Sequence, residues 1–333
     1  MQQDLELEFQ EIKQVTQVLQ AAQRIAIFSH KNPDGDTLGS QLALGKALQA
    51  AGKEVQLYNR DKIAEKYYFI DGADQVSSYQ DDQMLPETVV FVDCAEPGLA
   101  GVHLTDAAFA DKTIVNIDHH ASNKRYGTYN YVNATAGANC QNIYHLIGAL
   151  GQPITPAIAT ALYTGLSTDT GNFMFDNVSS ETLRMAADLK DLGADTNGMR
   201  WNLYESSSKK RIALLQYILN HLQFSQDGQS AWSSISYQMM QEIQPESTDI
   251  DGMINNIKDI EGVEVAMLFR GVSENRTKVS LRSKSWADVN QIAGMFGGGG
   301  HVRASGVTFE GDVEYAAAQL VPAVQAIIDQ NKA

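Results

Sequence analysis

Histidines and aspartates follow three apolar segments of this chain, at the point where each segment ends. They are His30, Asp34 and Asp36 after residues 24–29, Asp93 after residues 88–92, and Asp118, His119 and His120 after residues 113–117. Imidazole nitrogens and carboxylate oxygens bind divalent metal ions and transfer protons. These residue types therefore favour metal-assisted hydrolysis, if the fold brings them together.

The apolar segments have the length and composition of buried β-strands. Strands are predicted at residues 24–30, 54–59, 88–93 and 113–118. Helical patterns lie between and after them, and they cover residues 5–19, 38–51, 137–150, 156–166, 180–192 and 209–224. Alternating strands and helices predict an α/β fold, in which a parallel sheet carries helices on both faces. In such a sheet, ligands bind beyond the carboxyl ends of the strands, so the ionisable groups should converge there.

A further carboxylate, Asp169, lies in GLSTDTGNF after an apolar helix. Carboxylates crowded into one crevice repel each other, and without cations some of them would have to be protonated. Two divalent ions about 3.5–4 Å apart would remove this repulsion and clamp a phosphate. The predicted metal ligands are His30, Asp34, Asp36, Asp93, His119 and Asp169. Oxygen and imidazole ligands without thiolate favour Mn²⁺, Mg²⁺ or Fe²⁺.

A purely structural interpretation exists for each position taken alone. An aspartate after a strand is usually a helix cap or a turn residue, and the Pro-Asp-Gly-Asp sequence at 33–36 suits a turn. That interpretation would have to apply independently at three strand ends and at Asp169. The combined pattern therefore favours a site.

A second candidate site is the glycine-rich FGGGGH sequence, residues 296–301. The backbone N–H groups of Gly298, Gly299 and Gly300 could approach an anion closely. The alternative is a flexible surface loop. Arg282 and Ser283 end the preceding predicted strand, and with His301 they could bind a phosphate.

Length and patterning predict two domains. The chain has 333 residues, and from about Gln229 shorter strands such as 263–269 and 278–283 replace the earlier pattern. We expect an α/β catalytic domain at 1–200, a helical connector at 201–228, and a smaller α+β substrate-binding domain at 229–333.

The composition of the chain limits the classes of molecule that it could bind and the compartments that it could occupy. The formal net charge of −15 opposes binding along duplex nucleic acid, which needs many basic contacts, and favours short anionic substrates. Two cysteines, Cys94 and Cys140, do not suggest a disulfide framework. With no signal peptide and no run long enough for a membrane span, a cytoplasmic location is expected.

Taken together, these motifs resemble those of a known family. HKNPDGDTLGS, VVFVDC, NIDHHASN and STDTGNF are similar, in order and spacing, to the four motifs of the DHH phosphoesterase superfamily. SLRSK and FGGGGHVRASG resemble its associated C-terminal domain. Within the superfamily, the chain is most similar to two-domain oligoribonucleases that also act on 3′-phosphoadenosine 5′-phosphate.

The resemblance implies a role for each matching residue in a Mn²⁺-dependent enzyme. His30, Asp34 and Asp93 would bind one ion, and Asp36, Asp93, His119 and Asp169 the other, with Asp93 bridging. Asp118 would orient His119, and His120 would contact the scissile phosphate. Arg282, Ser283 and His301 would bind the terminal nucleotide.

Some positions depart from the family pattern. Gln141 replaces a common Glu, residues 95–101 lack an expected Arg, and Asn172 stands where a basic residue often follows the fourth motif. None is a predicted metal ligand, so the departures bear on substrate preference.

The expected function is hydrolysis of short single-stranded oligonucleotides, of 3′-phosphoadenosine 5′-phosphate, or of both, with homodimer formation left open. The main alternative is cleavage of a cyclic dinucleotide or its linear product. A pyrophosphatase of related fold, a long-chain single-strand exonuclease and a non-catalytic nucleotide-binding regulator fit the motifs less well.

Overall fold

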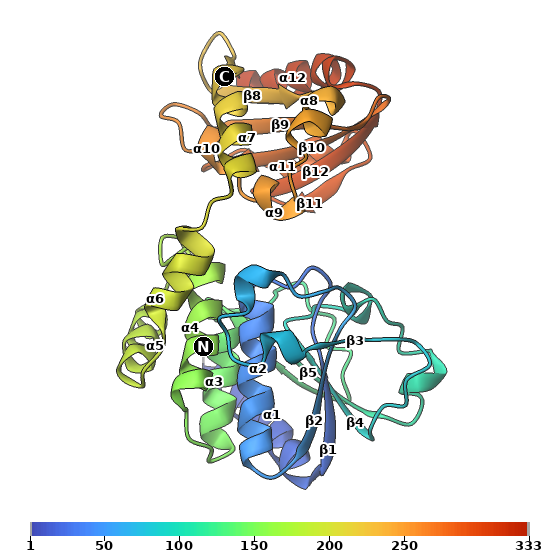
Figure 1. Ribbon diagram of the computed structural model, residues 1–333, viewed down its shortest axis with the longest axis vertical. Helices are drawn as coiled ribbons and strands as arrows, with labels where there is room; N and C mark the ends of the chain where they lie inside the picture. Colours follow the sequence, from blue (N-terminus) through green and yellow to red (C-terminus); the bar gives the residue numbers. More distant parts are fainter. Residues whose placement is uncertain (1, 332–333) are drawn as a thin grey trace. The chain divides into compact units, whose positions relative to one another are not determined.

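The computed structural model describes residues 2–331, and contacts divide the chain into two units, one ending at Ser206 and the other starting at Ser207 (Figure 1). The expected connector at 201–228 is not a separate unit. Helix α7 (Lys209–Asn220) lies within the second unit, because its Leu214 and Ile218 are buried in that unit's core. The described residues contain no helix that is long and apolar enough to cross a membrane.

The first unit is built on a parallel six-stranded sheet, as predicted. Its strands run in the order β3-β2-β1-β4-β5-β6. They are β1 (Arg24–Phe28), β2 (Glu54–Asn59), β3 (Ser77–Ser78), β4 (Thr88–Val92), β5 (Thr113–Asp118) and β6 (Tyr129–Val132). The four predicted strands are confirmed. The two edge strands β3 and β6 were missed because they are short and lack an apolar run.

Two different layers cover the faces of this sheet. The α-helices lie on one face of the sheet (Figure 1). Alternate strand residues such as Ile25 and Val90 pack against these helices. Phe28 and Phe91 point to the other face, where loops and short 3₁₀ helices cover them in place of the α-helices that were expected on both faces. The helices of this unit are α1 (Gln2–Ala21), α2 (Gly35–Ala50), α3 (Asn139–Ala149), α4 (Pro156–Asp169), α5 (Ser180–Asp191) and α6 (Thr196–Met199), followed by a π-helical turn at Arg200–Tyr204.

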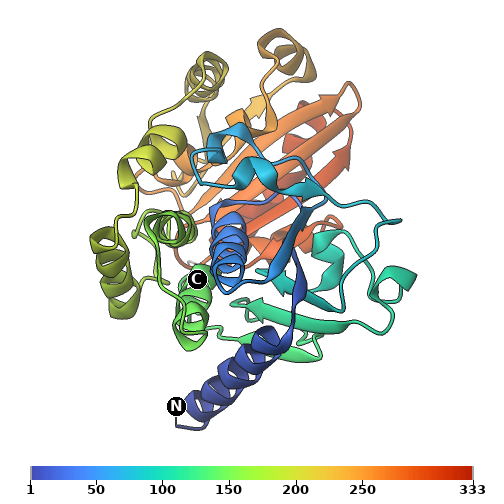
Figure 2. The same cartoon turned by 60° about the horizontal axis from the view of Figure 1, so that its bottom comes forward.

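Helix α1 contributes apolar side chains to the core through its C-terminal half, and Glu11, in its N-terminal half, accepts a hydrogen bond from the Val132 N–H of β6. Val15 and Leu19 are fully buried, whereas Phe9 is 62% exposed. Figure 2 shows the N-terminal turns of α1 extending beyond the body of the unit. The predicted helix is confirmed, and Phe9 lies outside the apolar core of the unit.

The second unit is a six-stranded mixed sheet in the order β11-β12-β10-β9-β8-β7. Only β8 and β9 pair in parallel. Its strands are β7 (Gln223–Phe224), β8 (Ser230–Ile235), β9 (Val265–Ser273), β10 (Arg276–Ser283), β11 (Gly299–His301) and β12 (Ala304–Glu310). Besides α7, its helices are α8 (Tyr237–Ile243), α9 (Ser247–Ile250), α10 (Asn255–Lys258), α11 (Val289–Gly294) and α12 (Val313–Gln330). One face packs on α11 and α12 and the other on α7 and α10, as expected for an α+β domain.

Helices α2 and α4 approach closely at Gly39, and both helices carry residues of the candidate site. A β-carbon at Gly39 would lie 2.4 Å from the carbonyl oxygen of Ala161 and 2.8 Å from Cys140 Sγ. Backbone atoms at that distance could move away only at a substantial cost in free energy, so the packing of α2 against α4 requires glycine at this position.

Gly39→Ala should therefore lower the free energy of unfolding by about 1–3 kcal/mol, despite the better helix propensity of alanine. Gly148→Ala is the matched control, because Gly148 lies in α3 with no atom within 4 Å of an added β-carbon. It should raise the free energy of unfolding by about 0.5–1 kcal/mol. Urea titration of the full chain measures both values, and a Gly39→Ala variant as stable as the control would contradict the packing account.

Candidate metal centre

The structure brings the ionisable strand ends of the first unit together. His30 follows β1, Asp93 follows β4, and His119 follows β5. His119 Nε2 lies 3.6 Å from Asp93 Oδ1, 3.8 Å from Asp36 Oδ2 and 3.5 Å from Asp169 Oδ2. His30 Nε2 lies 3.5 Å from Asp93 Oδ2. Asp169 is the last residue of α4, because this helix runs three residues further than predicted.

Three overlapping groups of side chains have the spacing of metal ligands. They are His30, Asp34 and Asp93; Asp36, His119 and Asp169; and Asp93, His119 and His120. Within each group the ligand atoms lie within 4.8 Å of one another. The six side chains predicted as metal ligands thus form one continuous cluster, and Asp93 belongs to two of its groups.

Asp93 is the centre of this cluster, and its own geometry fits a cation. The side chain is only 3% exposed, and Oδ1 has no hydrogen-bond partner among the described residues. Oδ2 accepts a 2.6 Å hydrogen bond from Thr37 Oγ1. The backbone adopts a φ of +53°, which is strained for a residue other than glycine. A buried carboxylate oxygen without a donor is costly, and a bound cation would remove that cost.

The partners of Asp93 determine its protonation. Burial by itself raises the pKa of Asp93, but the hydrogen bond and charge of His30, followed by the charges of His119 and His120, lower it to about 2. Burial by itself lowers the pKa of His30, but Asp93 and then Asp34 outweigh it and raise that pKa to about 9. Without metal, a proton on His30 therefore supplies part of the positive charge that the carboxylates need.

Asp36 lies at the start of α2 and is 1% exposed. Its two carboxylate oxygens accept from the backbone N–H groups of Asn139 (2.6 Å) and Cys140 (2.8 Å), at the start of α3. Burial, and then the negative charges of Asp93, Asp169 and Asp34, raise its pKa well above the usual range. The two backbone donors orient the carboxylate without neutralising it, which leaves it able to bind a cation.

Asp34 has a structural function as well as a place in the cluster. Its Oδ1 accepts from the backbone N–H groups of Asp36 and Thr37, both at 3.0 Å, and so caps helix α2. The helix-cap interpretation considered from the sequence thus applies to Asp34. The cap also fixes its carboxylate beside His30 and Asp93.

Asp169 completes the cluster from the C-terminal end of α4. Burial raises its pKa to about 6, with help from Asp93 and Asp34, although the charge of His119 acts in the opposite direction. His119 Nδ1 lies 3.2 Å from the carbonyl oxygen of Ala136, which orients the ring so that Nε2 faces the carboxylates.

Asp118 forms its hydrogen bond with His120 and not with His119, so the expectation that Asp118 orients His119 is wrong. Asp118 Oδ1 lies 2.8 Å from His120 Nδ1, and Oδ2 accepts from Asn123 Nδ2 at 2.5 Å. The hydrogen bond to Asp118 raises the pKa of His120. Alternate residues of an extended segment point the same way, which explains why Asp118 reaches the side chain two positions on rather than its neighbour.

Two residues of the site were missed from the sequence. Thr37 donates to Asp93 and contacts His30 Nε2, and Asn123 supports Asp118. Thr37 lies within the motif HKNPDGDTLGS and Asn123 within NIDHHASN, so their place in these motifs could have identified them from the sequence.

Two of the positions that depart from the family pattern make local hydrogen bonds. Gln141 accepts from Gly137 N and Thr182 Oγ1, both at 3.2 Å, and Asn172 accepts from Ser167 Oγ at 3.2 Å.

The second candidate site lies at one end of the sheet of the second unit. Arg282 pairs with Ala304, and the Ser283 N–H donates to the carbonyl oxygen of Arg303 at 3.1 Å. Ser283 Oγ is buried and has no hydrogen-bond partner among the described residues. Burial lowers the pKa of Arg282. His301 ends β11 and is exposed.

The glycine run forms regular structure rather than a free loop. Gly299, Gly300 and His301 make up β11, paired with β12. The N–H groups of Gly297 and Gly298 donate to carbonyl oxygens of α11, at 3.2 and 2.9 Å. A β-carbon at Gly298 would lie 2.3 Å from the carbonyl oxygen of Gly306, and one at Gly300 would lie 2.5 Å from that of Ala304. Close strand packing thus explains these two glycines, and the Gly298 N–H is already engaged.

A parallel sheet whose strand ends gather histidines and buried aspartates fits metal-assisted hydrolysis. Residues 24–166 match the model of the DHH family, N-terminal domain, and residues 234–331 match that of the DHHA1 domain. The chain belongs to the DHH family, so the resemblance of its motifs is confirmed.

Curated relatives match along almost the whole chain. A protein of Thermus thermophilus named bifunctional oligoribonuclease and PAP phosphatase NrnA is 33% identical over 95% of this chain and 94% of its own length. A protein of the same name from Bacillus subtilis is 24% identical over 85% of this chain and 88% of its own.

A solved structure supports the fold. An exopolyphosphatase-related protein of Bacteroides fragilis superimposes with a TM-score of 0.88 at 25% identity, covering 97% of this chain and 96% of that one.

The affinity of the centre for Mn²⁺ should depend on pH. A ligand must lose its proton to bind metal, and the pKa values of His30 and Asp169 are about 9 and about 6. Between pH 6 and 9 the His30 proton is lost on binding, so affinity should rise by at least roughly tenfold per pH unit, and more steeply wherever Asp36, whose pKa is also raised, still carries a proton. Below pH 6, protonated Asp169 should steepen the dependence.

Calorimetric titration with Mn²⁺ at several pH values measures this affinity, and buffers of different ionisation enthalpy count the protons released. His30→Gln is the matched variant. Its affinity for Mn²⁺ should be lower than that of the wild-type protein, and this affinity should change less with pH. An affinity that is the same at pH 7 and pH 8.5 in the wild-type protein would contradict the protonation of His30.

Proposed function

We propose that this chain hydrolyses short oligonucleotides to mononucleotides, 3′-phosphoadenosine 5′-phosphate to AMP, or both, with two Mn²⁺ ions in the first unit. The observation that carries the proposal is the cluster of six side chains around Asp93, a buried carboxylate with one unpartnered oxygen. The names of the Thermus and Bacillus relatives support the substrate class.

The first proposed ligand set is one of the observed groups, and the second adds Asp93, which lies 3.6 Å from His119, to the observed group of Asp36, His119 and Asp169. His30, Asp34 and Asp93 would hold one ion, and Asp36, Asp93, His119 and Asp169 would hold the other. Such ions supply a nucleophilic water at neutral pH and neutralise charge on the phosphate. Oxygen and imidazole ligands without thiolate suit Mn²⁺, with Mg²⁺ and Fe²⁺ as the other candidates.

The chain's own residues perform the remaining steps. Asp118 is fully buried and favours the imidazolium form of His120 through its 2.8 Å hydrogen bond. A protonated His120 can donate a hydrogen bond to the scissile phosphate or a proton to the leaving oxygen. Asn123 holds Asp118 from the other side, so the carboxylate cannot rotate away from His120.

The second unit is proposed to bind substrate. Arg282 and His301 offer positive charge or hydrogen-bond donors, Ser283 offers an unpartnered hydroxyl, and the backbone at Gly299 and Gly300 allows close approach. This division assigns catalysis to residues 1–200 and substrate binding to residues 229–333. The net charge of −15 opposes long polyanions and fits short substrates in the cytoplasm.

The test is a hydrolysis panel with Mn²⁺. It contains RNA and DNA oligomers of two or more nucleotides, 3′-phosphoadenosine 5′-phosphate, cyclic dinucleotides and pyrophosphate. Turnover of dinucleotides or of 3′-phosphoadenosine 5′-phosphate is expected. Protein that leaves both intact contradicts the proposal, and a preference for cyclic dinucleotides would favour the alternative within the same reaction class.

Asp93→Asn should abolish nearly all turnover, because it removes the charge of the carboxylate shared by the two proposed ligand sets. Asp111→Asn is the matched control, since Asp111 also has a positive φ, of +59°, and is exposed. Asparagine tolerates this backbone conformation, so both variants should fold. Initial rates with 3′-phosphoadenosine 5′-phosphate should fall only in Asp93→Asn, and substantial turnover by that variant would rule out the two-metal assignment.

A further inference from the structure

The segment that follows Asp169 has an unusual backbone. Gly171, Asn172 and Phe173 have φ values of +57°, +56° and +64°, so three consecutive residues are left-handed. Such a conformation is unfavourable for a bulky residue such as phenylalanine. Strain of this kind persists only where surrounding contacts enforce it, and it is concentrated at functional sites.

Thr170 enforces the turn. Its carbonyl oxygen accepts from the N–H groups of Met174 and Phe175, both at 3.0 Å, and its hydroxyl accepts from the N–H of Phe173 at 3.1 Å. Thr170 is fully buried. The ring of Phe173 points inward and contacts that of Tyr163, with 5.8 Å between centroids. The strained turn is therefore fixed on its inner side.

The same turn determines where Phe175 lies at the surface of the first unit. A β-carbon at Gly171 would lie 2.4 Å from the Phe175 ring, so the ring lies directly over that glycine, two residues from Asp169. The side chain is 52% exposed, and it makes no ring contact with another aromatic side chain of the described residues. The turn thus presents a half-exposed aromatic ring over Gly171, two residues from Asp169 of the metal centre.

We propose that Phe175 stacks on the nucleobase of the nucleotide whose phosphate is hydrolysed. This inference rests on the proposed function and extends it to base recognition. An exposed aromatic face binds any base by stacking, and a ring held in place by the backbone loses little entropy on binding. Stacking of this kind tolerates different bases, as degradation of short oligonucleotides of mixed sequence requires.

The experiment compares two substrates that differ only in the base. These are 3′-phosphoadenosine 5′-phosphate and ribose 3,5-bisphosphate, which carries the same two phosphates without adenine. Phe175→Ala should raise KM for the nucleotide by about 5- to 150-fold, the range expected for one lost stacking contact. KM for the base-free compound should stay the same, and Phe175→Trp should restore the wild-type KM for the nucleotide.

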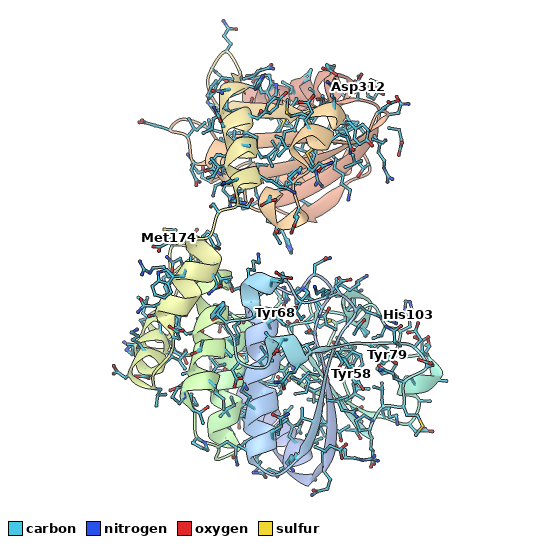
Figure 3. The ribbon with its side chains drawn as sticks, viewed as in Figure 1. Tyr58, Tyr68, Tyr79, His103, Met174 and Asp312 are labelled. Atoms are coloured by element: carbon cyan, nitrogen blue, oxygen red, sulfur yellow. The ribbon has the colours of Figure 1, made fainter. Side chains whose placement is uncertain are left out.

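Met174→Ala is the matched control, because Met174 is 78% exposed at the surface of the first unit (Figure 3) but has no ring. It should leave both KM values unchanged. If Phe175 only supported the turn and Asp169, Phe175→Ala would impair both substrates equally and weaken Mn²⁺ binding. That result, or an unchanged KM for the nucleotide, would overturn the stacking role.

Binding measured by calorimetry with Mn²⁺ separates this inference from the proposed function. Wild-type protein that binds 3′-phosphoadenosine 5′-phosphate but hydrolyses neither it nor dinucleotides contradicts the proposed function alone. Equal affinity of the wild-type protein and Phe175→Ala for this nucleotide contradicts the stacking role, whether or not hydrolysis is observed.

Discussion

Mutual repulsion among buried carboxylates is the constraint on which the rest of the first unit depends. Asp36 and Asp93 are almost fully buried, and Asp169 lies 3.5 Å from the same histidine that faces both. Without metal, protonation of His30 and the raised pKa values of Asp36 and Asp169 reduce this repulsion only in part. Divalent cations neutralise it more completely, so the fold holds a cation-binding arrangement in place at a cost to its own stability.

Each element around the cluster contributes to this arrangement. The carboxyl ends of β1, β4 and β5 place their residues at one edge of the sheet. The start of α3 orients Asp36 through two backbone N–H groups, and the end of α4 supplies Asp169. Close packing at Gly39 keeps α2 against α4. Helix packing therefore sets the spacing of the carboxylates and hence the space left for cations.

The sequence predicted the cluster because strand ends and motif order are properties of the chain itself. The four central strands and the six clustered side chains could be inferred from buried apolar runs and from the residues that follow them. The partner of Asp118 could not, since it depends on which way side chains point after β5. The exposure of Phe9, the burial of α7 in the second unit and the strand formed by Gly299–His301 depend on tertiary packing, which local patterns do not record.

The most direct test of the central claim is the number of ions that metal-free protein binds. Electron paramagnetic resonance measures free Mn²⁺ during a titration at pH 8, and so gives the stoichiometry without reference to any substrate. The proposal of two ligand sets that share Asp93 predicts two ions per chain. A single ion per chain, or none, would contradict the account.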